Sequence, residues 1–250
     1  MQLRMPQVNF DDALHTTYAQ GRQLGDDVMQ EWMRLVASLV EPSTVGCVVD
    51  LGAGTGRFST PLAATYRTRV VAVDPARNML TQIDPSIERV VAAAEHLPFA
   101  RRTADLVFAS MVIHLFADLE VAAAEISRVL RPRGHLLVRT CFAETLDAPY
   151  HQFFPSVIGI ERQLLPTTAE ATQVFESSGL RLASHERVRQ RMDGSWRAFA
   201  ERIRQRAMSP LRVISDEEFA KGMAALDATA AAEREPVEVF ETIDLVHFRQ

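Results

Sequence analysis

The residues best suited to do chemistry lie in the stretch VVDLGAGTGRFS, from Val48 to Ser59. Asp50 follows an apolar, strand-like run, and glycines come next at positions 52, 54 and 56. Glycine adopts backbone conformations that other residues avoid, and it lets a ligand approach the main chain closely. A turn of this kind between a strand and a helix predicts a binding site for a small molecule.

The spacing and the charge of this turn argue against a dinucleotide. A dinucleotide site has the pattern Gly-x-Gly-x-x-Gly, which directs a helix N-terminus at a pyrophosphate. Here the three glycines alternate with single residues, and Asp50 lies directly ahead of them. A carboxylate would repel a phosphate but attract an ammonium or a sulfonium group. Asp74 ends the next apolar run and could accept hydrogen bonds from both hydroxyls of a ribose.

Hydrophobic patterning predicts the elements that hold these residues. Short apolar runs alternate with helical patterns in the first half of the chain, which indicates a parallel sheet covered by helices. The expected strands of this half are 46–51, 69–74, 88–93, 104–110 and 135–140. The expected helices are 26–40, 56–66, 77–83 and 119–134.

The pattern changes after residue 140. Residues 141–166 are rich in aromatic residues and prolines, and we expect them to be irregular. A helix at 167–179, a strand at 180–192, helices at 194–208 and 215–235 and a final strand at 236–250 complete the expected elements. The late helices are expected to form a lid inserted before the last strand.

Five stretches together resemble a class I S-adenosylmethionine-dependent methyltransferase of the small-molecule branch around the ubiquinone and menaquinone methyltransferases. They are VVDLGAGTGRFS, VVAVDPARNML, VVAAAEHLPFA, DLVFASMVIHLFAD and ISRVLRPRGHLLVRT, and the resemblance covers roughly residues 10–140. It implies a doubly wound α/β fold with a mainly parallel, seven-stranded sheet, an antiparallel last strand and a helical lid insertion. Since no repeat and no linker marks a second domain, we expect one domain over 1–250, with a helical cap (1–40), a cofactor-binding half (41–140) and a substrate-side lid with the last strands (141–250).

The resemblance implies that the cofactor is S-adenosyl-L-methionine and the product S-adenosyl-L-homocysteine. Asp50, with the backbone of the glycine turn, would receive the methionine end, Asp74 the ribose, and Met79 the adenine face. Ala94 would contact the adenine edge through its amide, and Ser110 would touch the methionine portion. The full implied set is Tyr18, Arg22, Asp50, Gly52, Ala53, Gly54, Asp74, Pro75, Met79, Ala94, Glu95 and Ser110.

Two parts of this set have an alternative interpretation. Tyr18 and Arg22 resemble a segment that closes over the cofactor, but they could equally pack on the surface. Related proteins commonly carry an acid before the Ala-Glu pair, where it accepts a hydrogen bond from the adenine amino group. Ala93 stands there in this chain. Either that contact is lost, at about 1 kcal/mol for a modest hydrogen bond, or Glu95 replaces it.

The resemblance implies that a methyl group is transferred to a small-molecule metabolite by in-line displacement. Such a reaction depends mainly on positioning, and a base helps only if the acceptor must lose a proton. The candidate bases are His114, which follows the fourth strand, and His151, in the aromatic segment. Tyr150, Phe153, Phe154 and Trp196 could line an acceptor pocket or form the core of the lid.

Two other functions remain open. The segment from Arg181 to Arg212 holds nine arginines against three acids, which could serve an RNA or protein substrate. The chain lacks the Asn/Asp-Pro-Pro-Tyr/Phe motif after the fourth strand, and neither cysteine occupies a nucleophile position, so we expect no nucleic-acid partner. A cofactor-binding module without turnover is the other alternative.

The composition suggests a soluble cytoplasmic protein. The net charge of −5 is mild, and 47% of the residues are hydrophobic, enough for a substantial core. Cys47 and Cys141 form neither a disulfide framework nor a metal-ligand spacing, which favours a reducing compartment. We expect no metal, no signal peptide and no membrane span.

Overall fold

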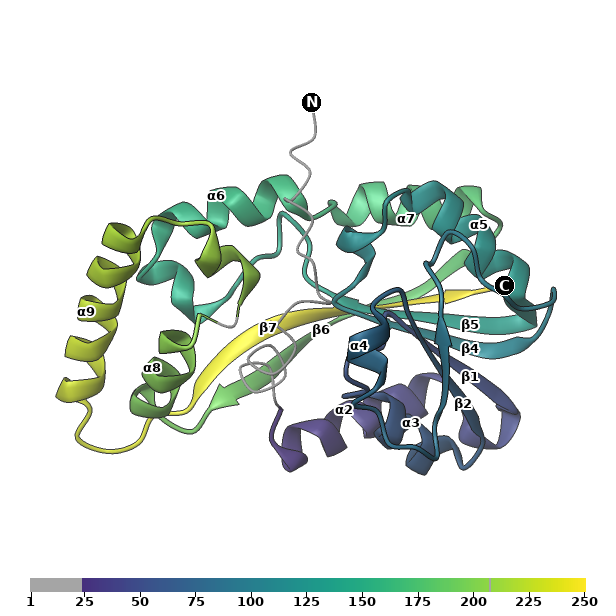
Figure 1. The fold of residues 1–250 in the computed structure, drawn as a ribbon, viewed down its shortest axis with the longest axis horizontal. Coiled ribbons are helices and arrows are strands. Elements are labelled where there is room, and N and C mark those ends of the chain that lie inside the picture. The colour runs from purple at the N-terminus through teal and green to yellow at the C-terminus, as the bar shows by residue number, and fades with distance from the viewer. Residues whose placement is uncertain (1–23, 207) are drawn as a thin grey trace.

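A seven-stranded sheet runs through the computed structural model, which describes residues 24–206 and 208–250 (Figure 1). The strand order is β3-β2-β1-β4-β5-β7-β6. The strands are β1 (Cys47–Leu51), β2 (Arg69–Asp74), β3 (Glu88–Val91), β4 (Ala104–Ser110), β5 (Leu130–Thr140), β6 (Arg181–Asp193) and β7 (Val239–Arg249). The α-helices are α2 (Asp26–Leu39), α3 (Ser59–Tyr66), α4 (Arg77–Leu80), α5 (Leu119–Val129), α6 (Pro155–Leu164), α7 (Thr168–Ser177), α8 (Trp196–Arg204) and α9 (Asp216–Ala232).

The sheet is parallel except for its last strand in sequence. β1, β2, β3, β4 and β5 pair in parallel, whereas β7 lies antiparallel between β5 and β6. All five residues of β1 are buried, as expected of a strand covered on both faces. The predicted fold class is therefore confirmed. Because the strands are parallel, the carboxyl ends of β1, β2, β4 and β5 meet at one edge.

Helices cover both faces of the sheet. One face packs on α5 and α7 through residues such as Ile126 and Phe175, and the other packs on α2 and α3 through Trp32, Val36 and Leu62. Figure 1 shows α5 and α7 above the sheet and α2 and α3 below it. Each of these side chains is at most 2% exposed. Two apolar layers therefore fix the sheet independently of any ligand.

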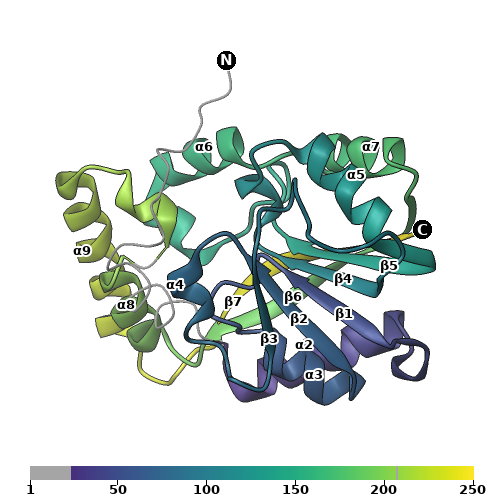
Figure 2. The same ribbon diagram turned by 45° about the vertical axis from the view of Figure 1, so that its right-hand side comes forward.

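A third hydrophobic core holds the helices beyond the carboxyl edge of the sheet. We call α6, α8 and α9 the outer helices; Phe154, Val157, Phe199 and Leu226 are fully buried among them. The long strands β6 and β7 extend to this core, and α8 and α9 lie between them in the sequence (Figure 2). None of the helices described is long and apolar enough to cross a membrane.

Two predicted boundaries were wrong. The helix expected at 119–134 ends at Val129, because Leu130 already pairs with Ala104 as the first residue of β5. The segment expected to be irregular, 141–166, contains α6, whose first residue is Pro155. Proline suits the first helical position because its missing N–H would have no partner there. The many prolines of this segment suggested a loop, although one of them begins a helix.

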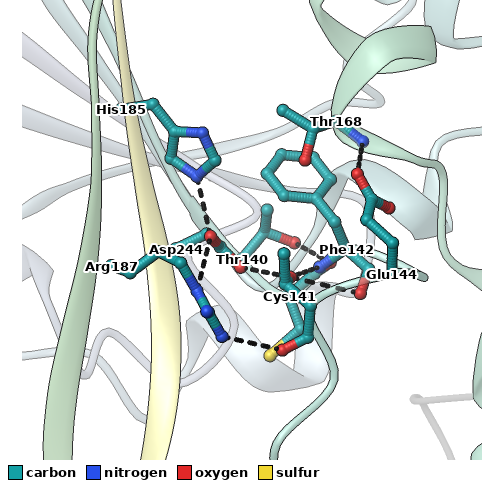
Figure 3. A network of polar contacts seen from close by, with 9 residues as sticks. Thr140, Cys141, Phe142, Glu144, Thr168, His185, Arg187 and Asp244 are labelled. Atoms are coloured by element: carbon teal, nitrogen blue, oxygen red, sulfur yellow. Dashed lines mark hydrogen bonds and ion pairs between the residues drawn. The ribbon is translucent and has the colours of Figure 1, made fainter.

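A buried aspartate fastens the chain where it leaves the sheet toward the outer helices. Asp244 of β7 is 1% exposed and accepts hydrogen bonds from Thr145 Oγ1 at 2.6 Å and His185 Nε2 at 2.7 Å. Arg187 adds an ion pair to Asp244 and donates to the carbonyl of Thr145 (Figure 3). Nearby, Glu144 accepts the amide of Thr168 at the start of α7. These contacts tie the segment after β5 to β6, β7 and α7.

A pair of histidines joins β5 and β7 near the opposite end of the sheet. His135 Nδ1 lies 2.9 Å from His247 Nε2, and His247 is 2% exposed. Burial lowers the pKa of His247 to about 4, with His135 and Arg249 adding repulsion. Burial also lowers the pKa of His135. Both imidazoles are therefore neutral in the folded protein at neutral pH.

This pair predicts a loss of stability in acid. The unfolded chain takes up a proton at His247 near pH 6.5, whereas the folded chain does so only near pH 4. The free energy of unfolding should therefore fall between these two values, by roughly 2–3 kcal/mol for a shift of this size. Urea unfolding at several pH values tests this. His247→Gln should flatten the fall, and an unchanged pH profile would contradict the assignment.

Candidate active site

The glycine turn after β1 is held by β2. The amides of Gly52 and Ala53 both donate to the carbonyl of Val73, at 2.7 and 3.0 Å. Gly52 has a φ of +69°, and a Cβ placed on it would lie 2.3 Å from Cγ2 of Val112. Gly56, at φ +80°, would place a Cβ 2.8 Å from Ile83. Only glycine fits these two positions, so the turn brings bare backbone to the carboxyl edge of the sheet.

Asp74 stands at the end of β2, opposite this turn. One carboxylate oxygen accepts the amide of Gly54 at 2.9 Å, and the other accepts the amide of Ala76 at 2.8 Å. A carboxylate accepts about four hydrogen bonds in total. Asp74 can therefore keep its orientation through the backbone and also accept hydroxyl groups of a ligand. Pro75, directly after it, is exposed.

Asp50 is a buried carboxyl group beneath the turn. It is 2% exposed and accepts a hydrogen bond from Ser59 Oγ, at the start of α3, at 2.6 Å. The pKa of Asp50 is raised to about 7, mainly by burial and in part by the nearby Asp74, while the hydrogen bond from Ser59 lowers it. A cation bound above the turn would favour its ionised form.

The residues expected near an adenine lie on two neighbouring segments. Met79 of α4 is 3% exposed, and its Cε lies 3.6 Å from a Cβ placed on Gly54. Ala94 follows β3 and is buried, as expected of a residue that acts through its backbone. The carboxylate of Glu95 accepts the amides of Ala117 and Asp118, at 2.6 and 3.2 Å. Glu95 therefore holds the loop before α5, and its side chain is engaged there.

A buried polar network that sequence patterns did not predict lies beside Ser110, at the end of β4. Arg139 of β5 is 2% exposed and donates to Ser110 Oγ at 3.3 Å and to Gln190 Oε1 at 2.5 Å. Gln190 of β6 also accepts from Trp32 Nε1 at 2.7 Å and donates to Glu241 of β7 at 2.5 Å. The guanidinium of Arg139 stacks 4.5 Å from the ring of Trp32. The network links four strands and α2 at the edge where the glycine turn lies.

The two candidate histidines lie in different surroundings. His114 belongs to the short 3₁₀ turn Ile113–Leu115 after β4 and is half-buried. His151 lies among the outer helices, where Nε2 is 2.5 Å from Glu161 and Nδ1 accepts the amide of Ala148. Glu161 is 7% exposed and also accepts from Tyr150 at 2.6 Å. Both ring nitrogens of His151 are therefore engaged.

Most arginines of the 181–212 segment have local partners. Ion pairs join Arg187 to Asp244, Arg191 to Asp27 and Glu238, Arg202 to Asp193, Arg204 to Glu201 and Asp227, and Arg206 to Asp216. Several of these acids come from outside the segment. The local excess of positive charge in the sequence is thus largely balanced in the fold.

The two cofactor-closing residues expected near the N-terminus, Tyr18 and Arg22, lie outside the described residues. Within the described part of the chain, no three histidine, cysteine or acidic side chains come together as metal ligands. Burial raises the pKa of the Cys141 thiol to about 12, so this cysteine is a poor nucleophile.

Among the described residues, a glycine turn after β1, an acid at the end of β2 and a sheet in which β7 alone is antiparallel are the features of the class I methyltransferase fold. Residues 49–138 match the family described as a methyltransferase domain. This part of the chain is therefore similar to a methyltransferase domain. Its structure is similar to that of a proposed methyltransferase from an antibiotic biosynthesis pathway of Anabaena variabilis, with a TM-score of 0.69, 19% identity and coverage of 86% of this chain and 96% of that one.

Other similarities are narrower. The malonyl-[acyl-carrier protein] O-methyltransferase of Methylovorus sp. is 38% identical over 40% of this chain and 38% of that protein. The ubiquinone/menaquinone biosynthesis C-methyltransferase of Syntrophotalea carbinolica is 33% identical over 47% and 53%. The chain thus spans about half or less of these relatives. Phosphoethanolamine N-methyltransferase 2 of Haemonchus contortus, solved with phosphomonomethylethanolamine and S-adenosylhomocysteine, has a TM-score of 0.52 and 18% identity over 82% of this chain and 48% of that one.

Because the carboxyl group of Asp50 is buried, its replacement by a neutral side chain should increase the free energy of unfolding in a pH-dependent way. The folded pKa, about 7, lies above the ordinary value of 3.8, so stability due to protonated Asp50 is lost as pH rises between these values. Asp50→Asn stays neutral throughout. Relative to the unaltered protein, the variant should gain roughly 2–4 kcal/mol of unfolding free energy between pH 4 and pH 8, an upper range for three pKa units. Urea unfolding without ligand measures it, and a constant difference at both pH values would contradict it.

Proposed function

We propose that this chain transfers a methyl group from S-adenosylmethionine to a small-molecule acceptor. The observation that carries the proposal is the pairing of Asp74 with the glycine turn. Its two oxygens are oriented by the amides of Gly54 and Ala76, at 2.9 and 2.8 Å, beside a turn whose glycines carry no side chain of their own. The matched methyltransferase domain, residues 49–138, contains both features.

The residues present fit this cofactor by their chemistry. Asp50 and the backbone at Gly52, Ala53 and Gly54 would receive the ammonium and carboxylate end. Asp74 and Pro75 would hold the ribose, and the buried thioether of Met79 offers an apolar surface to adenine. Ala94 would contact the adenine edge by its amide, and Ser110 would contact the methionine portion. When bound, S-adenosylmethionine supplies an electrophilic methyl group on a sulfonium.

The roles of two further residues follow from their contacts. Glu95 acts indirectly in this proposal, because its carboxylate holds the amides of Ala117 and Asp118. With Ala93 at the preceding acidic position, the adenine amino group would lack a carboxylate partner from this segment. The affinity for the cofactor should then depend chiefly on Asp74 and the glycine turn.

For the proton of the acceptor, we assign the role of base to His114 rather than His151. The ring of His151 is held at both nitrogens by Glu161 and Ala148 within the outer helices. His114 lies in the turn after β4, one short segment from Ser110. It would take a proton from an acceptor hydroxyl or ammonium, and the rest of the site would position the acceptor and exclude water.

A small acceptor is favoured over a macromolecule. A substrate such as RNA would require a continuous face of available positive charge. The arginines from 181 to 212 instead pair with acids of α2, α8, α9 and β7. Turnover with separate small-molecule and protein fractions of a cell extract distinguishes a free acceptor from one carried on a protein.

The cofactor assignment predicts selective binding. Calorimetric titration should show micromolar dissociation constants for S-adenosylmethionine and S-adenosylhomocysteine and no binding of NAD. Asp74→Ala should raise both constants at least tenfold, because a charged hydrogen-bond acceptor is worth about 1.5–3 kcal/mol. Asp84→Ala is the matched control, since the carboxylate of Asp84 accepts from the amide and hydroxyl of Ser86 rather than from the glycine turn. Equal affinities for all three proteins would refute the role of Asp74.

The acceptor assignment predicts which cell fraction supports turnover. Formation of S-adenosylhomocysteine should be stimulated by the small-molecule fraction of a cell extract and not by its RNA or protein fractions. His114→Gln should slow this formation about 100-fold or more, the range for loss of a general base, with cofactor affinity nearly unchanged. His96→Gln, an exposed histidine, is the control. Stimulation by RNA or protein alone would favour a macromolecular substrate, and binding without any turnover would favour a non-catalytic module.

A further inference from the structure

Two segments rich in arginine lie side by side at the amino ends of β4 and β5. The first is the turn with Arg101 and Arg102, and the second is the start of β5 with Arg131 and Arg133. Nε of Arg131 donates to the carbonyl of Arg102 at 3.2 Å, which joins the two segments directly. The C-terminus, beside these segments, lies at the opposite end of the sheet from α8 and α9 (Figure 1). Strand lengths of six or seven residues place this edge about 20 Å from the glycine turn.

A hollow of about 270 Å³ lies at these two segments. Its polar side chains are those of Arg101, Arg102, Ser127, Arg128 and Gln250, and no carboxylate side chain lines it. The hydroxyl of Ser127 donates to Oε1 of Gln250 at 3.1 Å, which leaves the amide nitrogen of Gln250 as a donor. A larger surface hollow, near α7, is lined instead by Glu144 and Glu176. The chemistry of the smaller hollow therefore suits an anion.

The arginines that line the hollow differ in whether they form ion pairs with acids of the chain. Arg128 is engaged with Glu125 at 2.6 Å and with the carbonyls of Phe99 and Leu97, so it is structural. Arg101 and Arg102 are exposed, and no acid of the described chain lies within ion-pair distance of them. The chain as a whole carries a charge of −5, so this positive lining is a local feature.

The backbone at Arg102 bears on the choice of variant. Arg102 has a φ of +59°, in the left-handed region where a residue with a Cβ is disfavoured. The amide of Arg102 donates to the carbonyl of Arg128 at 3.0 Å and holds this conformation. Glycine would adopt it at lower energy. Replacing Arg102 with glycine therefore removes the guanidinium without straining the backbone.

We propose that this hollow binds the phosphate group of a small phosphorylated molecule, at a site separate from the cofactor site. The planar guanidinium groups of Arg101 and Arg102 match the bidentate geometry of phosphate oxygens. Leu130 and Pro132 form the apolar part of the lining, against which a short carbon chain can pack. The volume is below the 300–1,000 Å³ of common ligand pockets. The ligand is therefore a phosphate monoester of a few carbons rather than a whole nucleotide.

The test uses glycerol 3-phosphate and inorganic phosphate as probes, titrated by calorimetry into the full chain at constant ionic strength. Both should bind saturably at one site. Arg102→Gly removes one guanidinium and relieves the left-handed backbone, so the dissociation constant should rise at least fivefold while the thermal midpoint stays equal or increases. Loss of binding then does not reflect unfolding.

Arg67→Gly is the matched control, because Arg67 is exposed and has a φ of +50° at the end of α3. It loses the same charge from the same backbone conformation and should leave the affinity unchanged. An equal loss in Arg67→Gly would show diffuse charge attraction and overturn the proposal. So would the absence of saturable binding, or binding of a short RNA without binding of glycerol 3-phosphate. None of these outcomes bears on the proposed methyl transfer, whose site is at the other edge.

Discussion

The site depends on one constraint: the amides of the turn after β1 must find acceptors although the turn leaves the strand abruptly. β2 supplies the acceptors of Gly52, Ala53 and Gly54, through the carbonyl of Val73 and the carboxylate of Asp74. Buried backbone groups rarely lack a partner, so the turn and the end of β2 form one unit. The contacts that provide acceptors for the amides of the turn also orient Asp74, the acid that would bind the ribose hydroxyls. Fold stability and ligand recognition are thus coupled at Asp74.

The local parts of this arrangement could be predicted from sequence, and the long-range parts could not. Asp50, the glycines and Asp74 each follow an apolar run, so their place at the carboxyl edge follows from strand patterning. Arg139 and Gln190 are separated by 51 residues, and their contact depends on β7 lying between β5 and β6. Neither residue is distinguished by its neighbours in sequence. α6 was missed for another reason, because its prolines suggested a loop where Pro155 begins a helix.

Arginine content illustrates the difference between composition and function. In the segment with the largest local excess of arginine, five arginines form ion pairs, mostly with acids of α2, α9 and β7. The turn at 101–102 and the start of β5 at 131–133 have no large local excess of arginine, yet Arg101 and Arg102 remain exposed at the hollow. Charge becomes a recognition feature only where the fold leaves it without a local acid. A count along the sequence cannot show this.

The contact between Arg139 and Trp32 has a spectroscopic consequence. The chain has two tryptophans: Trp32 lies in the network at the carboxyl edge, and Trp196 packs against Phe153 and Phe199 among the outer helices. A cation 4.5 Å from one indole and aromatic rings around the other give the two residues different electronic surroundings. Each half of the molecule thus carries its own intrinsic fluorophore, and single-tryptophan variants would separate the signal of the sheet from that of the outer helices.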